Sequence, residues 1–332
     1  MSAPIPLLRA EGSHAEVGRQ IGAATADGIR RAVAGMPFEP AVVEPYRAVA
    51  LEHLPWVVEE MDGAAEGAGV DPLALFAASV EELAPAETPT GCSDIVVRGG
   101  DGRLLVAHTN DLYAEDEQDV VAIEWRVPGE PVVFTLGTGP WLSVGWNDAG
   151  LSVTGNELSP NDERVGIPRL LQMRDVLTRR TMAEAVDAVL HPARASSYNW
   201  VLAHRDEGAL NVEGSATQAA IDELEADGSL AHTNHYARPD MLEFECSPYV
   251  EGSCRRLERA RELARGGPFG VDTLRAALSD HENAPDSICR HGDEEGVKTV
   301  FWCVADVSAG EVAYGRGNPC DGSRAQVYRF DA

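Results

Sequence analysis

The chain has 332 residues, which is long enough for one large or two ordinary domains with a developed hydrophobic core. Acidic residues outnumber basic ones by 54 to 27, the formal net charge is −27, and hydrophobic residues make up 44% of the chain. The composition is typical of a globular protein. The charge argues against binding to nucleic acid or to anionic membrane surfaces, because both need basic patches.

The first ninety residues have the sequence pattern of helices. Ser13 and Glu16 form a capping box in front of an amphipathic stretch. Pro55 interrupts a second amphipathic stretch and predicts either a kink or a later helix start. The Asp-Pro pair at 71–72 predicts the first residues of a third helix. The stretch 84–91 (APAETPTG) is rich in turn formers and ends this helical region.

The pattern changes at Cys92. Two apolar runs, 95–97 and 104–106, flank a glycine-rich turn and predict a β-hairpin. Strands, then helices, then strands follow. The predicted strands lie near 119–126, 131–136, 142–146, 150–155, 198–204, 209–214, 299–306, 311–315 and 326–330, with a further one ending at 232–235. Helices are predicted between 167 and 190, at 254–264 and at 271–278. This order favours a layered α+β fold, and no linker is rich enough to divide the chain.

Several common kinds of site are not supported. The chain has no G-x-S-x-G elbow, no phosphate-binding loop, no dinucleotide fingerprint and no C-x-x-C pair, so we expect no cofactor and no metal. His232 and His235 lie three residues apart without a carboxylate motif, a pattern more typical of structural histidines than of metal ligands. We find no secretory signal or run of about 18 apolar residues, and expect a cytoplasmic protein with reduced thiols.

Cys92 by itself reads as a small core residue, as free cysteines usually are. Its neighbours change this interpretation. The hairpin turns the segment 108–111 (HTND) back towards Cys92, and a second polar segment, 232–235 (HTNH), ends a later strand. Together Cys92, Asp111 and Asn234 supply the parts of an acyl-transfer site, namely a nucleophile, an orienting carboxylate and a donor to the oxyanion.

The segment around Cys92, TGCSDIVVRGGDGRLLVAHTNDLY, resembles the acyl-coenzyme A:6-aminopenicillanic acid acyltransferase family, whose members are autoproteolytic N-terminal nucleophile hydrolases of peptidase family C45. The resemblance continues through EGSHAEVGRQIG, VGWNDAGLSVTGNEL, VEGSAT, AHTNHY and SICRHGDEE. It implies a four-layer αββα sandwich. It also implies that the chain cuts itself into a helical segment, 1–91, and a catalytic segment, 92–332, which together remain one structural domain.

The resemblance also implies a role for each matching residue. The chain would break between Gly91 and Cys92, giving Cys92 a free α-amino group with a pKa near 7.7–8.0, suited to act as the general base. Asp111 would hold this amino group, and the Asn234 amide would donate to the oxyanion. Ser215 would assist the processing step. Glycine before the cut would permit the strained backbone that the attack needs.

The substrate stays open at this point. Leu112 and Tyr113, the candidate substrate contacts, replace an all-aromatic pair of the family, and the segment after SICR is shorter than in the penicillin enzyme. We expect an amide or N-acyl amine substrate, with hydrolysis and acyl transfer both open. The 1–91 fragment would stay bound as a noncovalent heterodimer, and pairing into a homo-oligomer is undecided. The alternative is an unprocessed, non-catalytic, small-molecule-binding homologue of the same fold.

Overall fold

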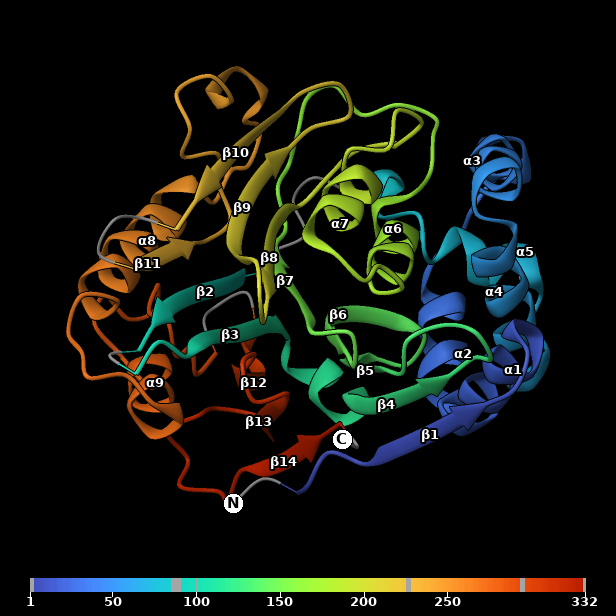
Figure 1. Cartoon of the computed structure of the whole chain (residues 1–332). Coiled ribbons are helices and arrows are strands. Elements are labelled where there is room, and N and C mark those ends of the chain that lie inside the picture. The colour runs from blue at the N-terminus through green and yellow to red at the C-terminus, as the bar shows by residue number, and fades with distance from the viewer. Residues whose placement is uncertain (1–2, 85–90, 100, 225–227, 293–295, 331–332) are drawn as a thin grey trace.

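The computed structural model describes residues 3–84, 91–99, 101–224, 228–292 and 296–330. Its strands form two sheets that lie face to face between helices (Figure 1). The eight-stranded sheet has the order β1-β4-β5-β6-β7-β8-β9-β10, and the six-stranded sheet has the order β11-β2-β3-β12-β13-β14. The strands of the first sheet are β1 (Leu7–Glu11), β4 (Val121–Arg126), β5 (Val133–Thr138), β6 (Trp141–Asn147), β7 (Leu151–Asn156), β8 (Asn199–His204), β9 (Gly208–Gly214) and β10 (Ala219–Glu223). Those of the second sheet are β2 (Gly91–Arg98), β3 (Leu104–Tyr113), β11 (Ser229–His232), β12 (Val297–Asp306), β13 (Glu311–Arg316) and β14 (Gln326–Arg329).

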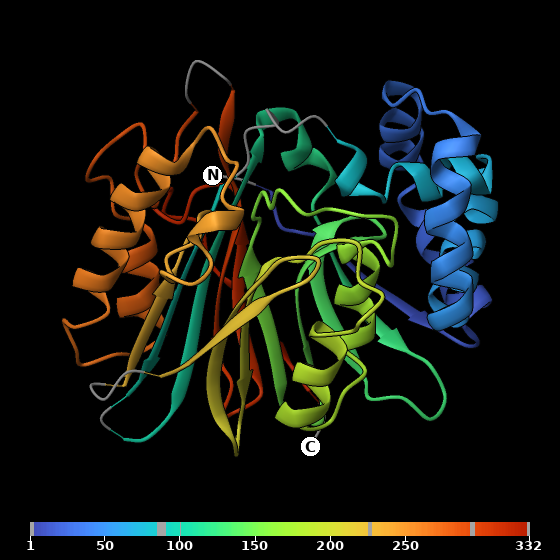
Figure 2. The ribbon, with the colours of Figure 1, turned by 90° about the horizontal axis from the view of Figure 1, so that it is seen from above.

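Helices cover the outer face of each sheet, as Figure 2 shows from above. The helices before Cys92 are α1 (His14–Ala24), α2 (Ala26–Gly35), α3 (Pro40–His53), α4 (Pro55–Ala68) and α5 (Pro72–Ala77). The later helices are α6 (Arg169–Val176), α7 (Met182–Val189), α8 (Val250–Leu263) and α9 (Val271–Leu278). Short 3₁₀ turns lie at Glu81–Leu83, Ala114–Asp119 and Leu242–Phe244. None of the helices in the described ranges is long and apolar enough to cross a membrane.

The apolar residues of β2 and β3 explain the layering. Successive side chains of a strand point to opposite faces, and both faces of these strands are buried. Val96 and Val106 belong to the core between the two sheets, whereas Ile95 and Leu105 pack against α8 and α9. A third core lies between the first sheet and helices α1, α6 and α7. The predicted four-layer αββα sandwich is therefore confirmed.

The local helix signals before Cys92 are confirmed. The Ser13 side chain caps α1 and Glu16 completes the capping box, while Asp71 accepts a hydrogen bond from the Ala74 amide at the start of α5. Pro55 is the first residue of α4, directly after the end of α3, so it marks a later start and not a kink. The residues 85–90 of the predicted turn-rich loop lie outside the described part of the chain.

Two strands differ from the sequence prediction. The first ninety residues are not entirely helical, because β1 pairs in parallel with β4 and extends the eight-stranded sheet. Strand β10, which pairs with β9, was not expected either. Both lie at edges of the same sheet, where half of the backbone has no strand partner, so a short alternating run is a weak signal.

Candidate active site

Cys92 is the second residue of β2, and the register of the β2–β3 hairpin decides what surrounds it. Gly91 pairs with Asp111, and Cys92 pairs with Asn110. Cys92 is 7% exposed, so its thiol is almost buried. The hairpin that the apolar runs predict therefore brings the candidate nucleophile and the candidate carboxylate to neighbouring positions, although 18 residues separate them along the chain.

The Cys92 thiol faces the space between the two sheets. The Asn110 side chain points the same way, and its Nδ2 lies 3.3 Å from Cys92 Sγ. Both residues line a pocket. Its other lining residues are Glu81, Leu112, Thr138, Trp141, Leu142, Ser143, Gly155, Asn156, Glu157, Leu170, Met173, Tyr198 and Asn199. A small molecule that enters this pocket meets the sulfur at one wall and mostly apolar or amide side chains around it.

Asp111 is fully buried and stands on the opposite face of β3 from Asn110, as the alternation of a strand requires. Its Oδ1 accepts a hydrogen bond of 2.7 Å from the Thr299 hydroxyl, and its Oδ2 has no hydrogen-bond partner among the described residues. Burial raises the pKa of Asp111, while the guanidinium groups of Arg290 and Arg256 oppose that rise. The carboxylate thus lies beside the Gly91–Cys92 backbone and not beside the sulfur.

Asn234 contacts the backbone of Cys92 directly. Its Oδ1 accepts hydrogen bonds from the Cys92 amide at 2.7 Å and from Arg256 at 2.9 Å. Its Nδ2 donates to the Glu157 carbonyl at 3.2 Å. The structure therefore brings Cys92, Asp111 and Asn234 together as expected. In this arrangement the Asn234 amide group donates to a backbone carbonyl, and its oxygen accepts from the backbone nitrogen of Cys92.

A buried histidine lies next to Cys92 on the pocket side of the hairpin. His108 Nδ1 is 3.1 Å from Asp94 Oδ1, and the two residues pair across β2 and β3. Burial alone lowers the pKa of His108, but Asp94 and the Cys92 thiol together outweigh burial and raise it to about 10. Asp94 also accepts hydrogen bonds from Thr154 at 2.6 Å and Asn156 at 2.9 Å, which ties the two sheets together.

Sequence reasoning assigned no role to His108 and Asn110. The signal that could have found them is the alternation of strand β3, since residues 108, 110 and 112 share one face with Cys92 and Asp94 once the hairpin register is known. The register itself depends on how the connection between β2 and β3 is made, and this is why the residue types alone were not enough.

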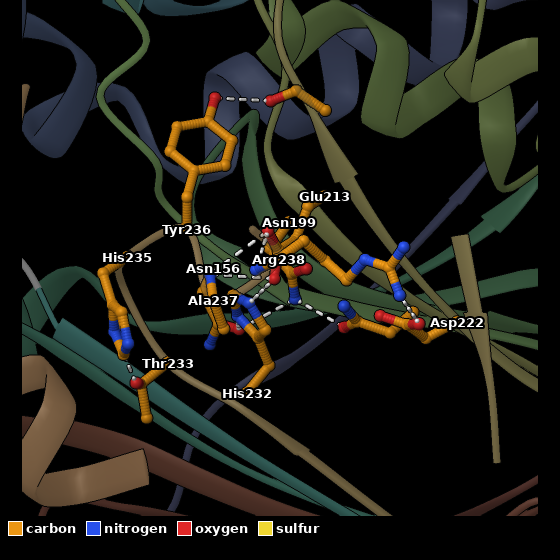
Figure 3. A network of polar contacts seen from close by, with 12 residues as sticks. Asn156, Asn199, Glu213, Asp222, His232, Thr233, His235, Tyr236, Ala237 and Arg238 are labelled. Carbon is orange, nitrogen blue, oxygen red and sulfur yellow. Dashed lines mark hydrogen bonds and ion pairs between the residues drawn. The ribbon is translucent and has the colours of Figure 1, made fainter. Parts of the chain in front are cut away.

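His232 and His235 belong to polar networks, as the sequence predicts. His232 lies between two acceptors, 3.0 Å from Asn156 Oδ1 and 3.0 Å from Glu213 Oε1 (Figure 3). His235 Nδ1 is 2.7 Å from the Ser253 hydroxyl, and burial lowers its pKa to about 4. Through Asn156, the His232 network joins the Asp94–His108 pair beneath Cys92.

Ser215 lies in a different network. Its hydroxyl donates to Asp162 Oδ2 at 2.9 Å and accepts from the backbone amide of Gln218 at 3.0 Å, in the turn after β9. Among the described residues no hydrogen bond joins it to Gly91 or Cys92. A role of Ser215 in processing stays a prediction.

The structure places only one of the two candidate substrate contacts, Leu112 and Tyr113, at the pocket. Leu112 lines the pocket, whereas Tyr113 is 38% exposed and is not among the described residues that line it. The one-residue step along β3 turns the two side chains to opposite faces of the sheet.

The reason for a glycine at position 91 is space. Gly91 is part of regular strand β2 and is not among the glycines with positive φ, so the expected backbone strain is not seen. A Cβ at this position would lie 2.9 Å from Asp111 Oδ2 and 3.0 Å from Arg290 Nη1. The absence of a side chain lets a carboxylate and a guanidinium approach the peptide bond in front of Cys92.

Comparison with known proteins agrees with the family that this geometry suggests. The profile described as "Acyl-coenzyme A:6-aminopenicillanic acid acyl-transferase" matches residues 97–321, most of the chain. The chain belongs to this family. The match includes Asp111 and Asn234 and begins five residues after Cys92, so it does not cover the candidate nucleophile.

The individual proteins that this chain resembles are distant from it in sequence. The chain is 23% identical over 367 residues to the β-alanyl-dopamine/carcinine hydrolase of Drosophila melanogaster, covering 96% of this chain and 94% of that protein. Among solved structures, it is similar to a conjugated bile acid hydrolase mutant from Clostridium perfringens, with 14% identity, a TM-score of 0.44, and coverage of 72% of this chain and 97% of the other. It is also similar to penicillin V acylase from Agrobacterium tumefaciens, with 13% identity, a TM-score of 0.41, and coverage of 71% and 84%. Family membership places the chain among the amide hydrolases and acyltransferases of the N-terminal nucleophile type.

Proposed function

We propose that the chain is an autoproteolytically activated amide hydrolase or acyltransferase that works through a thioester on Cys92. The observation that carries this proposal is the position of the Gly91–Cys92 bond. It stands at the start of β2, with a nearly buried thiol facing a pocket on one side and the Asp111 carboxylate on the other.

The activation step converts one amide into a thioester and then cuts it. Cys92 Sγ attacks the Gly91 carbonyl carbon and the C–N bond breaks. The nitrogen keeps its own proton and takes the proton that the thiol loses, which makes it the new α-amino group. Water then hydrolyses the thioester and returns the thiol. The Asn110 amide, at 3.3 Å from the sulfur, is placed to donate to negative charge that develops there.

The released α-amino group finds acceptors already in place. Asn234 Oδ1 holds the Cys92 nitrogen at 2.7 Å in the uncut chain. Asp111 Oδ2, which has no hydrogen-bond partner among the described residues, lies beside Gly91 on the same stretch of backbone. An amino group held by these oxygens, with an ordinary pKa of about 7.7–8.0, can take the thiol proton at neutral pH. In the uncut chain, Asn234 therefore binds the Cys92 nitrogen through its side-chain oxygen. To donate to an oxyanion, its Nδ2 would first have to break its hydrogen bond to the Glu157 carbonyl.

The pocket supports a small N-acyl amine as substrate. Leu112, Leu142 and Met173 supply an apolar wall for an acyl chain, while Glu81 and Glu157 bring carboxylates to the same pocket. Arg169 donates to both carboxylates, at 2.9 and 2.8 Å, so a positive charge partly balances the negative charge of this wall. Because the Drosophila relative is named for β-alanyl amines, we propose β-alanyl amides as the first substrates to test.

The intact mass of the purified chain tests the activation step. We expect two fragments, 1–91 and 92–332, from the native sequence, and a single uncut chain from Cys92→Ala. The matched control is Cys246→Ala, which removes an exposed thiol and should still be cut. The proposal is wrong if the native chain stays whole, or if Cys92→Ala is cut at the same bond.

Substrate turnover separates the enzyme from the alternative of an unprocessed binding homologue. Incubation of the cleaved protein with β-alanyl and other N-acyl amines, followed by rapid acid quenching, should trap an acyl group on the 92–332 fragment. A chain that stays whole and binds such amides without consuming them would favour the binding protein instead.

A further inference from the structure

A second cluster of reactive side chains lies outside the pocket. His281, Cys289, His291 and Cys320 each direct one ligand atom to a common point, and these atoms all lie within 4.8 Å of one another. The two sulfur atoms are 3.7 Å apart, and His291 Nε2 lies 3.7 Å from Cys289 Sγ and 3.3 Å from Cys320 Sγ. The Nε2 atoms of His281 and His291 are 2.8 Å apart.

We propose that these four side chains bind one Zn²⁺ ion in a structural site. Zinc takes four sulfur and nitrogen ligands at about 2.3 and 2.0–2.1 Å, which puts neighbouring ligand atoms of a tetrahedron about 3.3–3.8 Å apart. Three of the five separations that involve sulfur, 3.7, 3.7 and 3.3 Å, fall within that range, and the two between His281 and the sulfur atoms are no longer than 4.8 Å. The two histidine nitrogens need to move apart by about half an ångström. Two thiolates balance the charge of the ion, so a closed site of this kind is neutral.

The surroundings of Cys289 favour a metal ligand. The Asn318 side chain donates to Cys289 Sγ at 3.4 Å and to the Arg290 carbonyl at 2.6 Å. Hydrogen bonds from outside a metal centre commonly orient ligating sulfur in this way. The main alternative is a disulfide between Cys289 and Cys320, which would require the sulfurs to approach from 3.7 Å to about 2.05 Å.

The four ligands come from three segments that are separate in the sequence. His281 follows α9, Cys289 and His291 precede β12, and Cys320 lies in the turn after β13. Apart from the C-x-H pair at 289–291, no short spacing links them, so the search for C-x-x-C signatures could not detect the site. A metal would join these segments at one point, as structural zinc sites do.

The proposed metal site is next to the site of self-cleavage. Arg290 stands between two of the ligands, its backbone amide donates to Thr299 Oγ1 at 3.0 Å, and Thr299 donates to Asp111 Oδ1 at 2.7 Å. Arg290 Nη1 also lies 3.0 Å from the position of a Cβ on Gly91. By fixing residues 289 and 291, the ion would hold Arg290 against the Asp111 side of the scissile bond.

Metal content of the purified full-length protein tests this inference. After expression with zinc in the medium and gel filtration without chelator, we expect about one zinc per chain by elemental analysis. The exposed ligand variants His281→Ala and Cys320→Ser should lower this content at least tenfold, whereas Cys246→Ser, at another exposed cysteine, should leave it unchanged.

Two further measurements keep the test decisive if the variants fail to fold. Zinc in the native protein should be replaceable by Co²⁺, with the thiolate charge-transfer absorption of a tetrahedral two-sulfur site. The uncut Cys92→Ala chain should carry the same metal, so the result does not depend on self-cleavage. A native protein with less than about a tenth of an ion per chain, or with Cys289 and Cys320 joined as a disulfide in peptide mapping, would overturn the inference.

Discussion

At the scale of single residues, the site is governed by which face of the β2–β3 hairpin each side chain occupies. Cys92, Asn110 and His108 look into the space between the sheets, and Asp111 looks towards the helices. The candidate nucleophile and carboxylate therefore lie on opposite faces, and both adjoin the backbone between Gly91 and Cys92. Small changes at this backbone should have large effects.

The first prediction concerns Gly91→Ala. The new Cβ would lie 2.9 Å from Asp111 Oδ2 and 3.0 Å from Arg290 Nη1, so it would displace the two charged groups beside the scissile bond. We expect self-cleavage to slow at least tenfold, measured as the fraction of 1–91 fragment released over time after synthesis. Gly270→Ala is the control, because no atom lies within 4 Å of its Cβ position. Cleavage of Gly91→Ala at the native rate would contradict this account.

The second prediction concerns the buried Asp94–His108 pair. The pKa of His108 is raised from 6.5 to about 10 in the folded protein, so the protonated histidine stabilises the fold. This stabilisation is complete below pH 6.5 and is lost as the pH rises through about 10. The native protein should therefore have a larger free energy of unfolding than His108→Gln at low pH, and this difference should become smaller as the pH rises towards 10.

Urea unfolding of both proteins at pH 6.5, at an intermediate pH and at pH 10 measures this difference. The two proteins must be compared at equal concentration and in the same state of cleavage, because unfolding of a two-fragment protein depends on concentration. A difference that stays constant, or grows with pH, would show that His108 is not held protonated by Asp94.

At the scale of elements, α1 and α4 pack through glycines. Gly18 and Gly22 of α1 lie against the backbone of α4, and Gly63 and Gly67 of α4 lie against the backbone of α1. The sequence shows these residues as two G-x-x-x-G runs, but which helix each would meet depends on the tertiary fold. Close backbone approach leaves no room for a side chain, so these glycines are a sensitive point of the N-terminal segment.

The third prediction is that Gly22→Ala destabilises the protein. Its Cβ would lie 2.0 Å from the Ala64 carbonyl oxygen, a contact that forces the helices apart. We expect a loss of about 1–3 kcal/mol in free energy of unfolding, as for other overpacked sites, although alanine is the better helix former. Gly35→Ala in α2, with no atom within 4 Å, should cost nothing. Equal urea midpoints for the two variants would show that the helix crossing can relax.

At the scale of the whole molecule, the segment before Cys92 is part of the same fold as the rest. Strand β1 pairs with β4 (Figure 1). The Ile5 backbone also exchanges hydrogen bonds with the Gln326 side chain near the other end of the chain. Farther along, Glu82 is buried, and its Oε1 accepts from the Arg169 amide at 2.9 Å and from the Ser196 hydroxyl at 2.6 Å.

The fourth prediction follows from these contacts. After cleavage, the 1–91 and 92–332 fragments should elute together in native gel filtration and separate only in denaturant. The buried interface includes a sheet edge and helix α1 on the first sheet, whose exposure would be unfavourable. Separate elution of the fragments under native conditions would contradict this prediction. Glu81 would then leave with the 1–91 fragment and no longer line the pocket.

Local signals in the sequence were enough for most of the elements and pointed to Cys92 as the candidate nucleophile. The caps at Ser13 and Asp71, the proline at position 55 and the hairpin after Cys92 are all decided by neighbouring residues, and neighbours are what a sequence pattern records. The order of elements then indicated the layers, and the motifs around Cys92 indicated the family. Strand β1 was missed because only its distant partner β4 makes it a strand.

By itself, then, the sequence determined a layered α+β chain and predicted a cysteine nucleophile at its sharpest compositional boundary. Only the tertiary structure decided that Asn110 and His108 accompany the sulfur, that Arg290 approaches Gly91, and that two histidines and two cysteines from three segments converge. The physical reason is the range of the interactions. A cap or a turn depends on a few adjacent residues, whereas a pocket or a metal site depends on pairing between strands and loops far apart in the chain.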